Sequence, residues 1–309
     1  MKIRTYLSVT AFALASAASA NTICINSGSL GVAGNASNTD AVILDQPGVV
    51  AAGGDFSTGY SGPELTRHSR LPFNPLLNSS APFSIEFWAR PTLYNTDNAP
   101  VDNRIAGTNR SGWAFFQRAP GWTFRMYNGI GAQIGFDLTG GTSTLGSWSH
   151  VVATWDGTTA RLYVNGVFAD VTNAGTGAAV YAPSTTATLT IGALGDDSSP
   201  FYGNVDEVAF YGSALSAEKI SAHYNTVSST VPAAYSNLVK ADGAIVYYQQ
   251  NPAQVSIEEL GANKVVSFTG ILSQSPDLTP GSWQDLAVTS PYVVTPSTGT
   301  PKLFFRAHR

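Results

Sequence analysis

Residues 148–166 constrain the fold of this chain more than any other segment. They read WSHVVATWDGTTARLYVNG. Apolar and polar side chains alternate along 149–155 and again along 160–164, which is the two-residue period of a β-strand. Asp156-Gly157 and Asn165-Gly166 supply the backbone freedom that tight reversals need. The segment therefore predicts an antiparallel meander and an all-β fold.

The composition agrees with an exported β-protein. The chain has 309 residues, of which 12% are charged, about half the usual share. A chain of this length can bury a full core without covalent cross-links. Cys24 is the only cysteine, so we expect it to act as a small apolar residue on the first strand. The net charge of −4 and the lack of a Lys/Arg cluster argue against nucleic acid as a partner.

The first 20 residues have the organisation of an export signal. Lys2 and Arg4 precede an apolar stretch, residues 6–15, that is too short to span a bilayer, and residues 18–20 read A-S-A. We therefore expect a signal peptide over residues 1–20, cleaved near Ala20. The mature protein is then secreted, or retained in the periplasm or at the cell surface. No second apolar run predicts an integral membrane segment.

Four motifs carry a family resemblance. FSIEFWARP occupies residues 83–91, the meander occupies 148–166, LTIG occupies 189–192, and GNVDEVAFY with ALSAEKI occupies 203–220. In this order they resemble the laminin-G-like branch of the concanavalin A-like lectin/glucanase family. The resemblance implies a jelly-roll β-sandwich and leaves residues 230–309 unassigned.

The chain divides into a large and a small part. We predict the sandwich over residues 21–226, with one short helix at 216–224 that Ser216 caps. The polar stretch around Pro232 predicts a linker at 227–241. Short strands separated by Pro and Gly predict a small C-terminal β-module over residues 242–309.

The strand at 83–90 predicts a sheet that is covered on both sides. Phe83, Ile85 and Phe87 share one face, whereas Glu86 and Trp88 lie on the other. Large aromatic side chains on both faces suit a sheet that packs on one side and is partly covered on the other.

The sequence lacks the catalytic pattern of the glucanases that share this fold. The catalytic strand of those enzymes has a sequence pattern similar to E-x-D-x-x-E, which places two carboxylates on one face for glycoside hydrolysis. This chain has no such spacing, and we expect the adjacent Asp206 and Glu207 to point to opposite faces. His150 matches a structural position of the family. We predict that the protein is not an enzyme; a glycoside hydrolase with an atypical site is the less favoured alternative.

The resemblance also implies a structural calcium ion. Asp206 stands at the aspartate of the family's D-E motif, and Asp55 is a candidate second oxygen ligand. The alternative is that Asp206 only accepts hydrogen bonds from turn N–H groups.

Two loops combine aromatic rings with amide and carboxylate groups, as sugar sites do. The candidate ligand-binding residues are Tyr202, Phe201, Asp196, Asp197, Tyr94 and Asn95, and Trp113 and Trp122 are further aromatic candidates. For each ring, core packing is the alternative. We predict non-catalytic recognition of carbohydrate or of a glycosylated extracellular partner. The alternative is a structural or adhesive cell-surface protein that binds no small sugar.

Overall fold

The computed structural model describes residues 23–39, 41–51, 55–60, 67–95, 97–132, 134–173, 181–231, 233–250, 255–260, 263–268, 271–288, 290–295 and 303–308. The chain forms two compact units, a large one that ends at Asn251 and a small one over Pro252–Arg309. The predicted signal peptide and its cleavage site lie outside the described residues.

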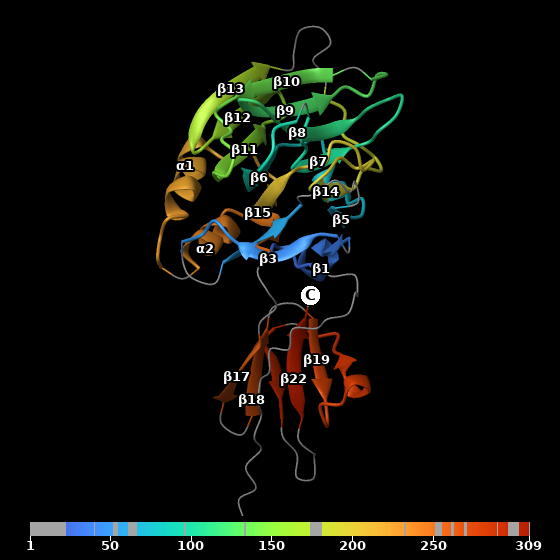
Figure 1. Cartoon of the computed structure of the whole chain (residues 1–309), viewed down its shortest axis with the longest axis vertical. Coiled ribbons are helices and arrows are strands. Elements are labelled where there is room, and N and C mark those ends of the chain that lie inside the picture. The colour runs from blue at the N-terminus through green and yellow to red at the C-terminus, as the bar shows by residue number, and fades with distance from the viewer. Residues whose placement is uncertain are drawn as a thin grey trace, which may run out of the picture. The chain divides into compact units, whose positions relative to one another are not determined.

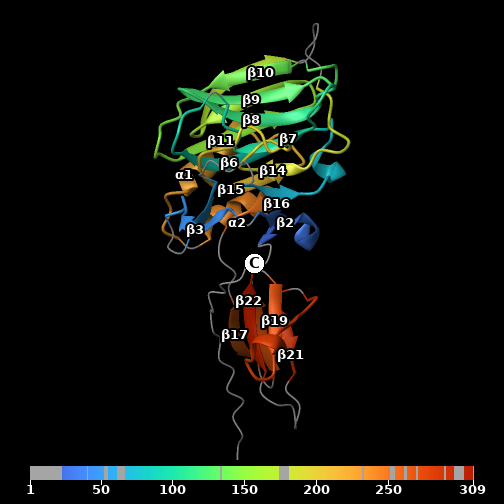
Figure 2. The same cartoon turned by 45° about the vertical axis from the view of Figure 1, so that its right-hand side comes forward.

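The large unit is a sandwich of two antiparallel sheets (Figures 1 and 2). Sheet A has the order β1 (Ile23–Cys24), β2 (Ala36–Asn38), β5 (Ser69–Leu71), β14 (Leu189–Ile191), β7 (Val101–Arg104), β8 (Gly112–Arg118), β9 (Gly121–Tyr127), β10 (Ile134–Gly140). Sheet B has the order β13 (Val167–Asn173), β12 (Thr159–Val164), β11 (Ser149–Trp155), β6 (Phe83–Pro91), β15 (Gly203–Tyr211), β4 (Phe56–Gly59), β3 (Ile43–Pro47). A further strand, β16 (Ala244–Tyr248), also pairs with β15. The all-β jelly-roll prediction is confirmed.

The hairpin predicted at 148–166 is formed by β11 and β12. Val151 pairs with Val164, and Trp155 pairs with Ala160. At the next turn Asn165 and Gly166 both take positive φ angles, of 53° and 73°. Asparagine and glycine tolerate this left-handed conformation better than other residues, which explains why this pair returns the chain into β13.

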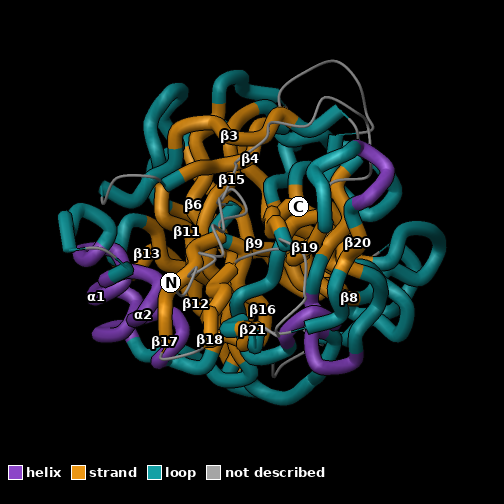
Figure 3. The backbone as a smooth tube through the Cα atoms, turned by 90° about the horizontal axis from the view of Figure 1, so that it is seen from below, coloured by secondary structure: helices purple, strands orange, loops and turns teal. Residues whose placement is uncertain are grey.

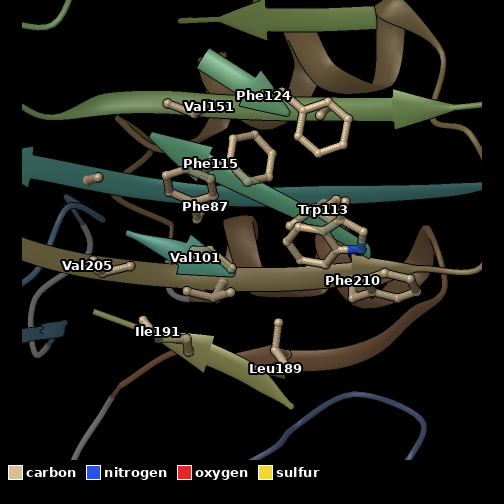
Figure 4. Close-up of a cluster of buried hydrophobic side chains, with 14 of the residues drawn as sticks. Phe87, Val101, Trp113, Phe115, Phe124, Val151, Leu189, Ile191, Val205 and Phe210 are labelled. Atoms are coloured by element: carbon tan, nitrogen blue, oxygen red, sulfur yellow. The ribbon is translucent and has the colours of Figure 1, made fainter. Parts of the chain in front are cut away.

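Aromatic side chains fill the space between the two sheets (Figure 4). Phe87 of sheet B meets Phe115 of sheet A edge to face, with ring centroids 4.9 Å apart. Trp113 and Trp122 also lie in this core and are fully buried. The proposal that these two tryptophans face a ligand is therefore wrong, because β8 and β9 direct them inward with the neighbouring phenylalanines.

Two helices cover the outer face of sheet B. They are α1 (Ala217–Thr226) and α2 (Ala234–Ala241), which lie next to each other in Figure 3. Their buried side chains form one cluster with Trp88, Val152, Tyr211 and others from the sheet. This is the second covered face that the aromatic residues of β6 predict. Ser216 caps α1 as expected, its Oγ accepting a hydrogen bond from the Lys219 N–H.

The linker predicted at 227–241 is wrong in its second half, and the module predicted to begin at residue 242 begins at residue 252. Helix α2 occupies Ala234–Ala241, and β16 pairs with β15 through Phe210 and Val246. The sandwich therefore extends well past residue 226. The α2 segment has only eight residues, too few for a stable helix in isolation, and packing against the sheet stabilises it.

Strand β16 also forms hydrogen bonds with residues 26–30. The Ser27 N–H donates to the Tyr247 carbonyl over 2.9 Å, and the Leu30 N–H donates to the Ile245 carbonyl over 2.9 Å. The Asn26 side chain accepts from the Tyr247 N–H over 2.7 Å. Hydrogen bonds thus join residues 26–30 to β16, although more than 200 residues separate them in the sequence.

The small unit consists of two three-stranded antiparallel sheets. One contains β17 (Val255–Leu260), β18 (Asn263–Phe268) and β21 (Tyr292–Val294); the other contains β20 (Gln284–Asp285), β19 (Ile271–Ser275) and β22 (Phe304–His308). Val266, Leu272 and Phe305 are its buried core.

Short 3-10 helices occur at Gly31–Gly34 and Pro75–Leu77 in the large unit and at Pro280–Ser282 in the small unit. Within the described part of the chain, no helix is long and apolar enough to cross a membrane.

Candidate functional site

A β-bulge on β15 changes the direction of its side chains. Strand β6 pairs Trp88 with Asp206 and Glu86 with Ala209, so two residues of β15 stand opposite one residue of β6. Glu207 takes a left-handed φ of 52° at this point. A bulge interrupts the strict alternation of a strand, and here it brings the carboxylates of Asp206 and Glu207 together. The expectation that they point to opposite faces is therefore wrong.

These two carboxylates form an acidic cluster with Asp55. One oxygen of each residue lies within 4.8 Å of the others. Val49 N–H donates to Asp206 over 3.0 Å, and Val50 N–H donates to Asp55 over 2.7 Å. The structure thus joins the two predicted metal ligands and adds Glu207, which the sequence pattern excluded.

Burial makes negative charge unfavourable in the acidic cluster. It raises the pKa of Asp55 to about 6. Burial, followed by the charge of Asp55, raises the pKa values of Asp206 and Glu207 well above the usual range. A bound proton or a bound cation relieves this cost. Three carboxylates next to a loop backbone are the hard oxygen donors that Ca²⁺ prefers, so the donor set fits the cation that the family resemblance implies.

The two loops predicted to bind a ligand, residues 94–103 and 196–202, fall in two segments that run side by side, although residues 101–103 belong to β7. One comprises residues 92–95 and 97–99, and the other comprises residues 193–202; together they are called the loop pair. Thr92 N–H donates to the Tyr202 carbonyl over 2.8 Å, and Ala99 N–H donates to the Ser199 carbonyl over 3.0 Å. Tyr94 and Asn95 are exposed and Tyr202 is half-buried. Residues more than 90 positions apart in the sequence therefore share one surface.

The remaining candidate residues differ in their availability to a ligand. Phe201 is fully buried in the core between the sheets, so its ring offers no surface to a ligand. Asp196 and Asp197 form ion pairs with Arg104 at 3.2 Å and Arg70 at 2.8 Å. Neighbouring residues of this loop thus divide between core packing and polar contacts.

A second buried polar group, centred on Glu86, has no counterpart in the sequence predictions. The carboxylate of Glu86 accepts hydrogen bonds from His150 Nε2 and His223 Nδ1, both at 2.8 Å, and from the hydroxyls of Tyr211 and Tyr235 at 2.7 and 2.8 Å. This Glu86 network joins sheet B to helices α1 and α2. It confirms a structural role for His150. In the sequence, Glu86 stands out only as the glutamate of the F-S-x-E-x-W motif. That motif does not predict which side chains form hydrogen bonds with it.

The fold and the loop pair define a lectin-like β-sandwich. The chain belongs to the concanavalin A-like lectin/glucanases superfamily, whose family model matches residues 64–221, more than half of the chain. Comparison with curated proteins gives no significant match.

Several solved structures resemble the chain at low identity. The binding domain of Paraclostridial Mosquitocidal Protein 1 is 13% identical, with a TM-score of 0.47 over 89% of this chain and 67% of that domain. A heptameric SAP-like pentraxin from Limulus polyphemus is 15% identical, with a TM-score of 0.43 over 63% of this chain and 96% of that one. A putative carbohydrate binding protein from Bacteroides ovatus is 15% identical, with a TM-score of 0.42 over 69% of this chain and 54% of that one.

Proposed function

We propose that the protein is an exported, non-catalytic recognition module that binds carbohydrate or a glycosylated extracellular partner through the loop pair. The observation that supports this proposal is the hydrogen bonding between the two loops, which carry exposed Tyr94 and Asn95 and half-buried Tyr202. Membership of a lectin-like superfamily supports it.

The chemistry of the loop pair suits saccharides. A tyrosine ring gives an apolar face on which a sugar ring stacks, and amide and carboxylate groups give directional hydrogen bonds to its hydroxyls. Backbone hydrogen bonds between the loops hold these groups in a fixed arrangement, which lowers the entropy lost on binding.

Two observations favour recognition over hydrolysis. The sequence has no E-x-D-x-x-E spacing. Glu86 and Glu207 are at most 1% exposed, and both are already hydrogen-bonded within the fold. A substrate cannot reach them without unfolding the sandwich, so a hydrolase would need a site of another kind.

We further propose that the acidic cluster holds a structural Ca²⁺. Asp55, Asp206 and Glu207 would supply carboxylate oxygens. The ion would balance their buried charge and fix the loop before β4 against β15. Its role would be to stabilise the fold.

A glycan array, probed with the purified mature chain in calcium and again in chelator, tests the function. The proposal predicts selective binding to a group of related glycans. Binding to none of them in either condition would overturn it. Release of reducing sugar from polysaccharides would instead support the hydrolase alternative.

An exposed apolar edge favours a second candidate, adhesion to another protein. Strand β13 ends sheet B, and its Val167, Phe168 and Val171 side chains are 67%, 52% and 45% exposed. Exposed edge strands can pair with other chains. Self-association measured by light scattering, together with a negative glycan array, would favour this role.

A further inference from the structure

The part of the loop pair between Ala193 and Ser199 lies over the outer face of sheet A. Val101 of β7 points into the core, so the next residue, Asp102, points outward. The Gly195 N–H donates to the Asp102 carboxylate over 2.7 Å, and Asp196 pairs with Arg104 of the same strand at 3.2 Å. This segment, called the cover loop, thus buries two charged residues of β7.

An apolar contact also holds the cover loop. Leu194 packs into a small buried cluster on the outer face of the sheet, whose other members are Ala99, Ala114, Phe116 and Tyr127. Two aromatic rings therefore lie under the cover loop, beside the charged pair. If the loop lifts, an aromatic surface and polar groups become accessible together.

The charged pair beneath the loop has unused hydrogen-bonding capacity. Among the residues that the structure describes, none forms a hydrogen bond with Asp102 Oδ1, Arg104 Nε or Arg104 Nη1. Asp102 is fully buried, and the Arg104 side chain is 5% exposed. Oδ1 and Nε lie 3.9 Å apart. Buried polar atoms normally have partners, so three such atoms at one place point to a ligand that supplies them.

The chemistry of the unused atoms selects a hydroxyl-bearing ligand. A hydroxyl group can accept from a guanidinium N–H and at the same time donate to an ionised carboxyl group or accept from a protonated one. Two neighbouring hydroxyls, as on a sugar ring, can serve all three unused atoms.

The charge of the surroundings selects against an anionic ligand. The Arg104 guanidinium already faces the carboxyl groups of Asp102 and Asp196. Burial raises the pKa of Asp102 to about 8, so its carboxyl group is mostly neutral near pH 7 and negative charge is unfavourable there. A neutral sugar therefore fits better than an acidic one.

We propose that Asp102, Arg104 and Tyr127 form a subsite for the adjacent hydroxyls of a neutral saccharide, and that the cover loop closes over it. The proposal rests on the proposed function and identifies a site and a sugar class for it.

The attachments of the cover loop allow its tip to move while its base stays in place. The base is fixed by backbone hydrogen bonds from Gly192 N–H to the Pro100 carbonyl and from Phe201 N–H to the Gly192 carbonyl, at 2.9 and 2.8 Å. The tip is held by the Gly195–Asp102 hydrogen bond, by the packing of Leu194, by the hydrogen bond from Ala99 N–H to the Ser199 carbonyl, and by ion pairs of Asp196 and Asp197, whose side chains are 37% and 45% exposed. For the tip to lift, all of these contacts must break while the base stays in place. Water and salt screen the ion pairs.

The test is an NMR titration of the mature chain with four probes. They are the methyl glycosides of β-D-galactose, β-D-glucose and α-D-mannose, and D-glucuronate as the acidic control. We expect at least one neutral probe to shift both the Arg104 Nε–H signal and the Gly195 amide signal, and glucuronate to shift them less. A stronger shift with glucuronate would overturn the choice of a neutral sugar.

Variants separate this subsite from glycan binding elsewhere. For the neutral probe that binds, Asp102→Asn should weaken affinity about tenfold because it replaces the carboxyl group with an amide, and Asp196→Asn should strengthen it about threefold by freeing the loop. Asp156→Asn is the matched control, since it breaks a similar pair with Arg161 on sheet B. Circular dichroism would verify that each variant is folded.

The outcomes distinguish the two proposals. A positive glycan array with unmoved Arg104 and Gly195 signals, and with parental affinity in both loop variants, would overturn the subsite and leave the proposed function standing. A negative array with no shift for any probe would overturn both.

Discussion

Glu86 accepts a hydrogen bond from His223 Nδ1 over 2.8 Å, and this contact joins the middle of sheet B to helix α1. Both side chains are fully buried. The other imidazole nitrogen, Nε2, lies 3.0 Å from Asp242, which follows helix α2. One histidine thus connects a strand and two helices through two acidic partners.

Replacing Glu86 should destabilise the large unit severely. Glu86→Gln removes the negative partner of His150 and one of the two acidic partners of His223. Loss of one member of a buried ion pair costs about 3–5 kcal/mol. Urea denaturation followed by tryptophan fluorescence measures the change. Glu218→Gln is the control, because Glu218 lies on the exposed side of helix α1. It should change stability by less than about 0.5 kcal/mol. Equal effects of the two variants would contradict the role of the network.

The pH dependence of stability should reflect His223. Burial acts to lower the pKa of His223, but the charge and hydrogen bonds of Glu86 and Asp242 outweigh it and raise the pKa above its usual value of 6.5. Stability from this histidine is therefore fully present below pH 6.5 and is lost as the pH rises through the higher folded-state pKa. The free energy of unfolding should decrease across this window, and His223→Gln should flatten the decrease. If the free energy of unfolding decreases equally steeply with pH in the variant, other titrating groups cause the pH dependence.

Calcium should stabilise the protein in a pH-dependent manner. At pH 7.5 a chelator should lower the melting temperature by several degrees, because a ligand that binds only the folded state adds to its stability. At pH 5 the effect should be smaller, because the pKa of Asp55 is about 6 and protons compete with the cation. Differential scanning fluorimetry measures both. Asp206→Asn should abolish the calcium effect, and identical melting curves with calcium and chelator would exclude the metal.

Tyr202→Ala should weaken glycan binding more than it weakens the fold. Tyr202 is only half-buried, unlike its fully buried neighbour Phe201, so its removal should cost little packing energy. The best glycan from the array, titrated by calorimetry, gives the affinity. Tyr292→Ala, which removes another half-buried tyrosine in the small unit, is the control. Unfolding of the Tyr202 variant would instead assign that ring to the core.

The alternation of side chains made the sandwich predictable. On β6, Phe83, Ile85 and Phe87 are in the core between the sheets, whereas Trp88 lies under the helices. The sequence predicted this division because strand geometry alone determines it. The hairpin of β11 and β12 was predictable for the same reason, together with its two turn sequences.

The site depended on departures from regular geometry. Asp206 and Glu207 come together only because Glu207 adopts a left-handed backbone at a bulge, and no local sequence rule requires a bulge at a glutamate. Phe201 and Tyr202 are neighbouring aromatic residues of one predicted loop, with Tyr202 the preferred candidate, and only the three-dimensional path of the loop shows that Phe201 is buried. Contacts between distant segments, such as Glu86 with His223, cannot be derived from either segment alone.

The hydrogen bond from Ser27 N–H to the Tyr247 carbonyl joins residues 220 positions apart in the sequence. Contacts of such long sequence separation slow folding, because the intervening chain must be ordered before they can form. The hydrogen bonds that join residues 27–30 to β16 therefore cannot form until nearly the whole large unit has been synthesised.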